Sequence, residues 1–342
     1  MMDYGLRFPV KPMMARLKAS PPMGEGWVYE PKWDGFRMIA FGGEPLGMAS
    51  RNGKDLLRYF PELRPGLERL PPGTVVDGEI VLVVDDVTQF DLLQMRIHPA
   101  ESRIKRLAEE LPARLVAFDL LVDSGEVLLD QPYQSRRERL EGAVGGLGTP
   151  WYLTPVTRDF EQATAWFHDF EAAGCDGIIS KQDSGVYALG KRAWVKWKHR
   201  RQVNCVIGGF RIHKEGDRVG SLLLGVYNPE GELHFLGHTS GFSDQERIDL
   251  LEALNGIRSD RSFGGDKTRS PGSENRWTGK RSTDWVPVQP LLVAEISYDQ
   301  LEGWRFRHAA RLERWLPDHN PKDCTADQLE RPKGMGFSQI FA

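Results

Sequence analysis

The sequence is poor in the features that mark disulfide-rich, zinc-binding and membrane proteins. Its three cysteines, Cys175, Cys205 and Cys324, stand far apart without a Cys-x-x-Cys pair. We therefore predict neither a disulfide framework nor a zinc site, and we expect the thiols to pack as small apolar groups. No apolar run reaches the length of about 18 residues needed to cross a bilayer, and the N-terminus lacks a signal-peptide core. We expect a cytoplasmic protein with no membrane partner.

An excess of positive charge is also missing. Lys and Arg number 45 against 48 Asp and Glu, a net charge of −3. A domain that binds phosphates is expected to be basic, so binding of an anionic polymer has to rest on local clusters of charge. Hydrophobic residues at 40% and charged residues at 27% are typical of a globular protein, and 342 residues favour about two domains.

One stretch combines a lysine, a carboxylate and a tight turn. Residues 28–37 read Val-Tyr-Glu-Pro-Lys-Trp-Asp-Gly-Phe-Arg, and an alternating strand, 36–41, leaves the Asp-Gly turn. A lysine attacks electrophiles only as the neutral amine, and its ordinary pKa is about 10.4. A catalytic Lys32 therefore needs a dry pocket or a cationic neighbourhood that lowers its pKa. The alternative is a solvated lysine on a structural hairpin.

Two later stretches place charged residues in a turn and in a strand. Arg51 heads a Ser-Arg-Asn-Gly turn and is otherwise an ordinary loop residue. Residues 74–84 form a β-branched strand that Asp77, Gly78 and Glu79 interrupt. Carboxylates in such a strand are hard to bury unless they are paired or bind a metal. The alternative is a bulge at a sheet edge.

Two further strands are predicted from composition and alternation. Residues 115–122 read as a buried strand, in which Phe118 would ordinarily be part of the core. Residues 191–201 are the densest basic stretch, and strand alternation places Lys196 and Lys198 on one face. The alternative for this stretch is a solvated charged strand.

Capping residues and turns organise the rest of the chain. Ser135 and Ser243 each precede a Glu by three residues, which predicts helix N-termini, and Asp159 precedes an amphipathic aromatic helix. Beyond residue 201, short apolar strands with one helix suit a small barrel such as an OB-fold. Residues 258–281 carry seven basic and three acidic residues, and we expect a mobile loop that either contacts phosphates or is merely solvated.

These stretches, in this order, resemble the motifs of the covalent nucleotidyltransferases: ATP-dependent DNA ligases, RNA ligases and mRNA capping enzymes. The chain is most similar to the compact bacterial ATP-dependent DNA ligases. The resemblance implies an α+β fold. It comprises a nucleotidyltransferase (adenylation) domain at residues 1–201, with antiparallel sheets and packed helices, an OB-fold β-barrel at 202–328 and a tail at 329–342.

The resemblance also implies roles for individual residues. Lys32 would be the catalytic nucleophile that takes AMP from ATP. The nucleotide-binding residues would be Glu30, Arg37, Arg51, Glu79, Phe118, Lys196 and Lys198. Glu30 would face the adenine amino group, and Phe118 would stack on the base. Lys196 and Lys198 would meet the phosphates and supply the cationic neighbourhood that Lys32 needs.

Two motifs depart from the family's usual form. The implied metal ligands for Mg²⁺ or Mn²⁺ are Glu79 and Asp176, where the family has a glutamate in place of Asp176. The shorter side chain favours coordination through water. Residues 314–319 resemble a ligase motif, commonly Arg-Trp-Arg-Pro-Asp-Lys, that orients the departing pyrophosphate in the family. It retains Arg314 and Asp318, but Leu and His replace its second arginine and its lysine.

The implied activity is the sealing of 5′-phosphate/3′-hydroxyl nicks in double-stranded DNA during DNA repair. We expect a monomer, with a repair polymerase or an end-binding protein as partner. Two alternatives stay open. An RNA ligase or a GTP-using capping-type nucleotidyltransferase would share the lysine motif, and Leu316 and His319 suggest a DNA-end-binding protein that has lost self-adenylylation.

Overall fold

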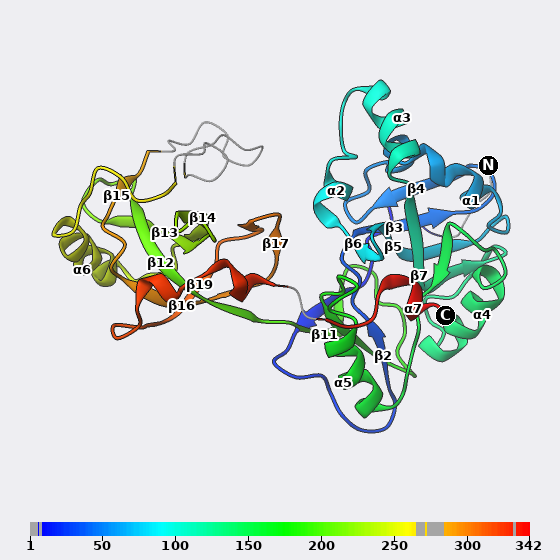
Figure 1. Cartoon of the computed structure of the whole chain (residues 1–342). Coiled ribbons are helices and arrows are strands. Elements are labelled where there is room, and N and C mark those ends of the chain that lie inside the picture. Colours follow the sequence, from blue (N-terminus) through cyan, green and yellow to red (C-terminus); the bar gives the residue numbers. More distant parts are fainter. Residues whose placement is uncertain (1–5, 7–8, 265–270, 272–283, 331–332) are drawn as a thin grey trace. The chain divides into compact units, whose positions relative to one another are not determined.

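The chain forms two compact units (Figure 1). The computed structural model describes residues 6, 9–264, 271, 284–330 and 333–342. Unit 1 comprises Met1–Lys198 and Arg331–Ala342, and unit 2 comprises His199–Glu330. The chain therefore leaves unit 1, forms unit 2 and returns to unit 1 at its C-terminus. Among the described residues, every helix is too short or too polar to cross a membrane.

Unit 1 is an α+β unit with two sheets. A seven-stranded sheet has the order β4-β3-β5-β7-β8, with β6 paired to β5 and β9 to β7, and a four-stranded sheet has the order β1-β11-β10-β2. β1 pairs with β11, and β9 with β7, in parallel, and the other neighbouring strands are antiparallel. Its strands are β1 (Met14–Leu17), β2 (Trp27–Pro31), β3 (Phe36–Phe41), β4 (Gly47–Ser50), β5 (Val75–Val84), β6 (Val87–Thr88), β7 (Ala113–Asp123), β8 (Glu126–Val127), β9 (Trp151–Leu153), β10 (Gly177–Gln182) and β11 (Arg192–Lys198).

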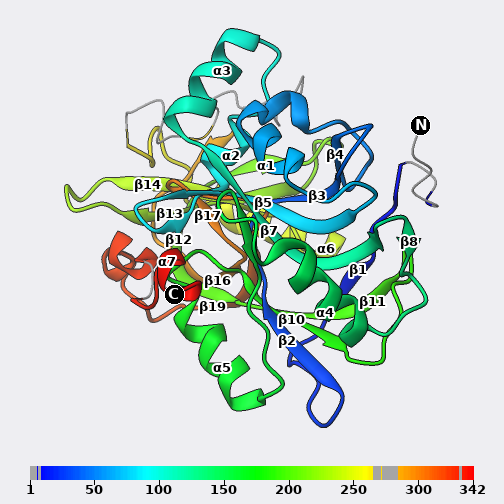
Figure 2. The ribbon, with the colours of Figure 1, turned by 90° about the vertical axis from the view of Figure 1, so that its right-hand side faces the viewer.

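Helix α2 (Phe90–Gln94) packs against β5, α4 (Tyr133–Val144) against β7, and α5 (Phe160–Asp169) against β2 and β10, as Figure 2 shows for α5. The other helices of unit 1 are α1 (Arg64–Glu68), α3 (Glu101–Glu110) and α7 (Phe337–Ile340). Asp159 caps α5 as predicted, because its carboxylate accepts a hydrogen bond from the Glu161 amide at 2.8 Å. The predicted cap at Ser135 is wrong. Pro132, whose fixed φ suits the residue before a helix, is the N-cap of α4 instead.

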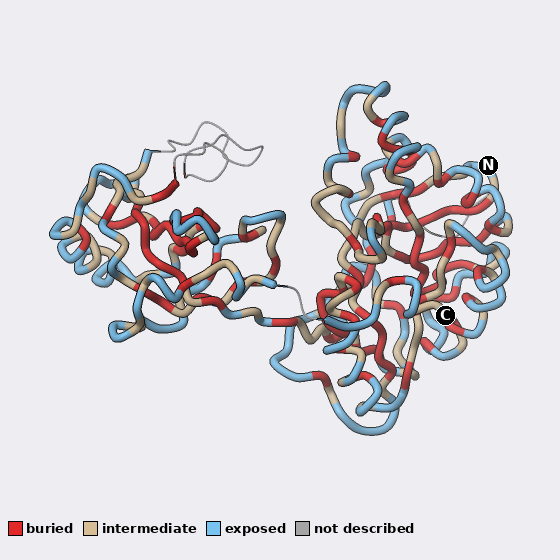
Figure 3. Tube along the Cα trace, in the orientation of Figure 1, coloured by how far each residue is buried: buried red, intermediate tan, exposed pale blue. Residues whose placement is uncertain are grey.

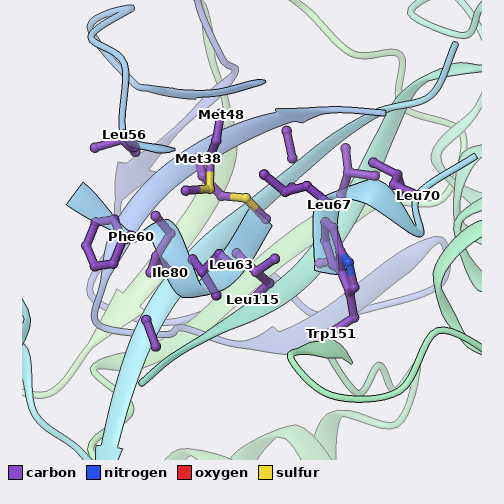
Figure 4. Close-up of a cluster of buried hydrophobic side chains, with 14 of the residues drawn as sticks. Met38, Met48, Leu56, Phe60, Leu63, Leu67, Leu70, Ile80, Leu115 and Trp151 are labelled. Carbon is purple, nitrogen blue, oxygen red and sulfur yellow. The ribbon is translucent and has the colours of Figure 1, made fainter. Parts of the chain in front are cut away.

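The seven-stranded sheet is buried on both faces. Successive residues of a strand point to opposite faces, and on β3 Met38 and Ala40 join one apolar cluster while Ile39 and Phe41 join another. The central strands are accordingly buried along most of their length (Figure 3). Figure 4 shows part of the first cluster, in which side chains of the strands meet Leu63 and others from the short helices.

Unit 2 is built on an antiparallel sheet of order β14-β13-β12-β16-β19, with β15 also paired to β12, beside a β17-β18 hairpin. Its elements are β12 (Arg201–Ile212), β13 (Val219–Tyr227), β14 (Leu233–Thr239), α6 (Asp244–Asn255), β15 (Val286–Pro287), β16 (Val293–Tyr298), β17 (Leu301–Glu302), β18 (Arg305–Phe306) and β19 (Arg311–Trp315). The capping box predicted from Ser243 and Glu246 is confirmed at the start of α6. The assignment of this unit to the OB-fold stays a prediction.

The structure tests the prediction made for the cysteines but not the one made for the basic stretch. All three cysteines are buried, so the prediction that they pack as apolar groups is confirmed. Most of the basic stretch at 258–281 lies outside the described residues, and its interpretation stays a prediction.

Burial of Leu67 on α1 generates a prediction about stability. Leu67 is fully buried in the cluster of Figure 4. Leu67→Ala is expected to lower the free energy of unfolding of the protein by about 2–5 kcal/mol, because it removes apolar contacts and leaves a cavity. Leu17→Ala, on the exposed face of β1, serves as control and should stay within about 0.5 kcal/mol of wild type. Denaturant unfolding measures both, and equal effects of the two variants would contradict the assignment of Leu67 to the core.

Candidate active site

Strand register brings the distant motifs of unit 1 together. On β10, Ile179 lies opposite Glu30 of β2 on one side and opposite Lys196 of β11 on the other. In the larger sheet, Arg37 of β3 lies opposite Glu79 of β5. A cavity of about 270 Å³ is lined by residues of both sheets. The predicted residues that line it are Glu30, Lys32, Arg37, Arg51, Glu79, Phe118 and Lys196.

Two motif glycines allow the strands to approach at this cavity. A Cβ atom on Gly35, in the turn after Lys32, would lie 2.0 Å from the carbonyl oxygen of Ile80. A Cβ on Gly177, at the start of β10, would lie 2.0 Å from the carbonyl oxygen of Trp197, and Gly177 has φ of +136°. Only glycine tolerates both the close approach and the positive φ.

The amine of Lys32 belongs to a compact cluster of charges. Its Nζ lies 2.8 Å from Asp176 Oδ2, and the same oxygen lies 3.0 Å from Lys198 Nζ. The Lys32 side chain is only 21% exposed. The structure therefore brings together three predicted residues: Lys32 directly after β2, Asp176 directly before β10 and Lys198 at the end of β11.

The charge state of Lys32 differs from our expectation. Burial disfavours the charged amine, but attraction by Asp176, and then by Asp34 and Glu79, outweighs it and raises the pKa of Lys32. The prediction that neighbouring lysines lower this pKa is wrong, because the Asp176 carboxylate pairs with both Lys32 and Lys198. The pKa of Lys196, in contrast, is lowered by burial and then by these two lysines.

The interrupted strand is a bulge inside the sheet. The pairing of β5 with β7 shifts register between Asp77 and Gly78, so the bulge is confirmed, but β5 lies between β3 and β7 and the sheet-edge position is wrong. The two carboxylates have different surroundings. Asp77 is fully buried and accepts hydrogen bonds from Arg37 and from the Tyr187 hydroxyl. Burial raises the pKa of Glu79 to about 7, although Arg37 and Lys32 oppose the shift.

Arg37 lines the cavity, but its guanidinium is held by the protein. Both oxygens of Asp77 accept hydrogen bonds from it at 2.5 Å, and the Met13 carbonyl accepts another at 3.1 Å. The guanidinium carbon also lies 4.6 Å from the centre of the Phe118 ring and 5.1 Å from that of Trp194. Arg37 therefore joins β3, β5 and Met13, the residue before β1, in the wall of the cavity.

Lys181 is a cavity-lining residue to which we assigned no role from the sequence. Its side chain is 1% exposed, and its Nζ donates to the Phe118 carbonyl and lies 2.8 Å from Glu30 Oε1. It also lies 4.4 Å from the centre of the Trp194 ring. Glu30 accepts a further hydrogen bond from the Tyr133 hydroxyl. The available signal was the lysine that ends the Gly-Ile-Ile-Ser-Lys run of residues 177–181.

The remaining predicted residues lie at the rim of the cavity or in unit 2. Arg51 lines the cavity but is exposed. In unit 2, Arg314 is paired with Glu295 at 2.8 Å, and Asp318 is exposed. Leu316, which stands where the related motif has an arginine, packs against an apolar cluster of unit 2.

Comparison with known proteins agrees with this geometry. The model of the ATP dependent DNA ligase domain matches residues 12–198, and that of the ATP dependent DNA ligase C terminal region matches residues 215–319. DNA ligase C1 of Mycolicibacterium smegmatis is 44% identical over an alignment of 353 residues that covers 99% of each chain. The multifunctional non-homologous end joining DNA repair protein LigD of Mycobacterium tuberculosis is 32% identical over 324 residues, 92% of this chain and 38% of that protein.

A solved structure shows the same similarity. The mycobacterial DNA ligase D complexed with ATP and MES is 29% identical and aligns with a TM-score of 0.51, covering 94% of this chain and 99% of that one. The match to the ligase domain alone spans more than half of this chain. By these matches, and with the lysine motif placed in the wall of a cavity, the chain belongs to the ATP-dependent DNA ligases.

Proposed function

We propose that this ligase seals 5′-phosphate/3′-hydroxyl nicks in double-stranded DNA, with Lys32 as the residue that carries AMP. The observation that supports this most is the position of the Lys32 amine, paired with Asp176 and lining the same cavity as Glu30 and Phe118. A purine in that cavity would stack on Phe118, and Glu30, oriented by Lys181 and Tyr133, would accept a hydrogen bond from the adenine amino group.

The reaction consists of three phosphoryl transfers, in which positioning and charge neutralisation do most of the work. Lys32 Nζ loses its proton and attacks the α-phosphorus of ATP; a P–N bond forms and pyrophosphate departs. A 5′-phosphate oxygen of the nick then attacks the same phosphorus, and the P–N bond breaks. Finally the 3′-hydroxyl attacks the 5′-phosphorus, AMP departs and the strand is joined. Lys196 and Lys198 would offset negative charge on the phosphates.

A divalent cation fits two carboxylates of this site. Asp176 Oδ1 is buried and has no hydrogen-bond partner among the described residues, and Glu79 retains a raised pKa despite its cationic neighbours. Oxygen ligands of this kind suit Mg²⁺ or Mn²⁺. In the part of the chain that the structure describes, no group of three or more such ligands is present, so nucleotide oxygens or water would complete the shell. The cation would supply further neutralisation of phosphate charge.

We also propose roles for unit 2 and for the protein in the cell. We assign unit 2 to the OB-fold domain and its Arg314 and Asp318 to self-adenylylation or DNA contact, in line with the ligase C-terminal match at residues 215–319. The similarity to a relative named for non-homologous end joining supports a role in DNA repair. An end-binding protein or repair polymerase would then be the partner of a monomeric enzyme.

The lysine assignment predicts a selective loss. Lys32→Ala is expected to abolish the covalent AMP adduct, which mass spectrometry detects after incubation with ATP, and to abolish sealing of nicked DNA. It should still join nicks that already carry AMP, because that step does not use the amine. Lys54→Ala, an exposed lysine beyond the following hairpin, is the matched control and should behave as wild type. An adduct that persists in Lys32→Ala would overturn the assignment, and preference for GTP or nicked RNA would favour the capping-enzyme or RNA-ligase alternatives.

The ion pair predicts a dependence on pH. Because Asp176 raises the pKa of Lys32, the neutral amine is scarce at neutrality and its fraction grows about tenfold per pH unit below that pKa. The rate of adduct formation at saturating ATP should therefore rise between about pH 7 and pH 9. Asp176→Asn removes the stabilising negative charge, so the rise should begin at lower pH. A rate in wild type that stays constant over this range would contradict a limiting deprotonation of Lys32.

The raised pKa of Glu79 predicts how a cation affects stability. A carboxylate with an ordinary pKa of 4.5 that is held at about 7 binds its proton more tightly in the folded protein than in the unfolded chain. The stability of the cation-free protein should fall as pH rises from about 4.5 to about 7, and stay lower above. Glu79→Gln should therefore raise the melting temperature above neutrality and have little effect near about pH 5. Mg²⁺ should stabilise wild type more than Glu79→Gln; equal stabilisation would exclude Glu79 as a ligand.

A further inference from the structure

The C-terminal residues that follow unit 2 complete the core of unit 1 directly behind the Lys32 turn. In Figure 1 the red helix α7 lies among the green and blue elements of unit 1. Phe337 is fully buried in an apolar cluster, which we call the rear cluster. Its buried members are Trp33, Val81, Val116, Phe170, Cys175 and Phe337. Phe341 packs against it.

Aromatic contacts join the tail to Trp33. The Phe341 ring stacks on the Trp33 indole with centres 5.4 Å apart and planes at 15°, and Phe337 meets the same indole edge-on at 5.6 Å. Both phenyl rings also contact Tyr152, with ring centres 4.9 Å apart for Phe341 and 5.2 Å apart for Phe337. The Arg114 guanidinium lies 4.9 Å from the centre of the Phe337 ring. Aromatic pairs and cation–π contacts of this kind stabilise the folded protein beyond the contribution of apolar burial.

Hydrogen bonds hold the tail in this position. The Phe337 amide donates to the Asp86 carbonyl at 2.7 Å, and the Ser338 amide and hydroxyl donate to the two carboxylate oxygens of Asp86 at 2.7 and 2.8 Å. The Met335 amide donates to the Asp169 carbonyl at 3.0 Å. The tail is therefore docked by specific contacts with the β5-β6 turn and the end of α5.

The rear cluster supports both partners of the Lys32–Asp176 ion pair. Trp33 directly follows Lys32, and Cys175 directly precedes Asp176. The backbones of the two ion-pair residues are tied together, since the Asp176 amide donates to the Lys32 carbonyl at 2.8 Å. Trp33 is fixed further by its indole N–H, which donates to Thr154 Oγ1 at 2.9 Å. Removal of the Phe337 and Phe341 rings would leave one face of the Trp33 indole without a packing partner.

We propose that Phe337 and Phe341 are positioning residues for Lys32, so that the C-terminal tail sets the rate of self-adenylylation. The inference rests on the proposed role of Lys32. The ligase-domain match ends at residue 198 and the C-terminal-region match at residue 319, so neither includes the tail. A displacement of about 1 Å at a reacting group can lower a rate about a hundredfold, and a partly relaxed Trp33 should cost about tenfold or more.

The test compares single steps in full-length variants. Phe341→Ala removes the stacked ring, and Phe341→Tyr retains it with its hydroxyl at a partly exposed position. Met335→Ala is the matched control, because Met335 is exposed and its backbone hydrogen bond remains. For each variant we would measure the maximal rate of AMP-adduct formation, the ATP concentration at half-maximal rate, the joining of nicks that already carry AMP, and the melting temperature.

Phe341→Ala is expected to slow adduct formation about tenfold or more, while the half-saturating ATP concentration and the joining of adenylylated nicks stay within about twofold. Phe341→Tyr and Met335→Ala should match wild type. Phe337→Leu, which keeps apolar volume but loses the ring, should repeat the selective loss if Phe341→Ala is too unstable at the assay temperature. An equal decrease in both steps, or an unchanged rate of adduct formation, overturns the inference.

The outcomes separate this inference from the proposed function. If wild type forms an adduct that Lys32→Ala lacks, and Phe341→Ala retains the wild-type rate, only the role of the tail fails. If Lys32→Ala still forms the adduct, the proposed nucleophile is wrong whatever the tail variants do.

Discussion

The carboxylate of Asp176 is the interaction on which the site depends. One of its oxygens pairs with the amines of both Lys32 and Lys198, two like charges that would repel each other without it. The pairing favours the protonated form of Lys32, the proposed nucleophile, so the amine has to lose its proton before it can attack a phosphorus atom.

The walls around this cluster are made rigid by buried ionic contacts. Arg37 with Asp77 and Arg136 with Asp119 are paired through two hydrogen bonds each. Taking such charges out of water is costly and is tolerated only when geometry and further hydrogen bonds satisfy them. Their value here is orientation, because the first pair joins β3 to β5 and the second joins α4 to β7, the strand that carries Phe118. Lys181 acts similarly in the wall of the cavity, where it binds both a carboxylate and a carbonyl.

The path of the chain adds a second constraint. Unit 2 is connected to unit 1 at both of its ends, because the tail returns to the rear cluster after Glu330. Trp33, the aromatic residue next to Lys32, thus packs against residues that follow unit 2 in the chain. The two units nevertheless have separate apolar cores.

The sequence by itself located several of the elements and seven of the fifteen residues that line the cavity. Alternation located β3 and β11, β-branched or buried composition located β5 and β7, capping residues located α5 and α6, and motifs singled out residues such as Lys32 and Glu79. These signals are local, since they depend on periodicity, turn chemistry and neighbours a few residues away. Such local signals do not determine the register between strands that are distant in sequence.

Only the tertiary structure decided which charges meet. It placed Asp176 between two lysines and so reversed the expected shift of the Lys32 pKa, and it bound Arg37 to Asp77 within the wall. It also folded the C-terminal tail against Trp33, a contact that no local pattern in the tail indicates. The physical reason is that burial and pairing energies depend on distances across the fold, and these are fixed by packing rather than by neighbours in the chain.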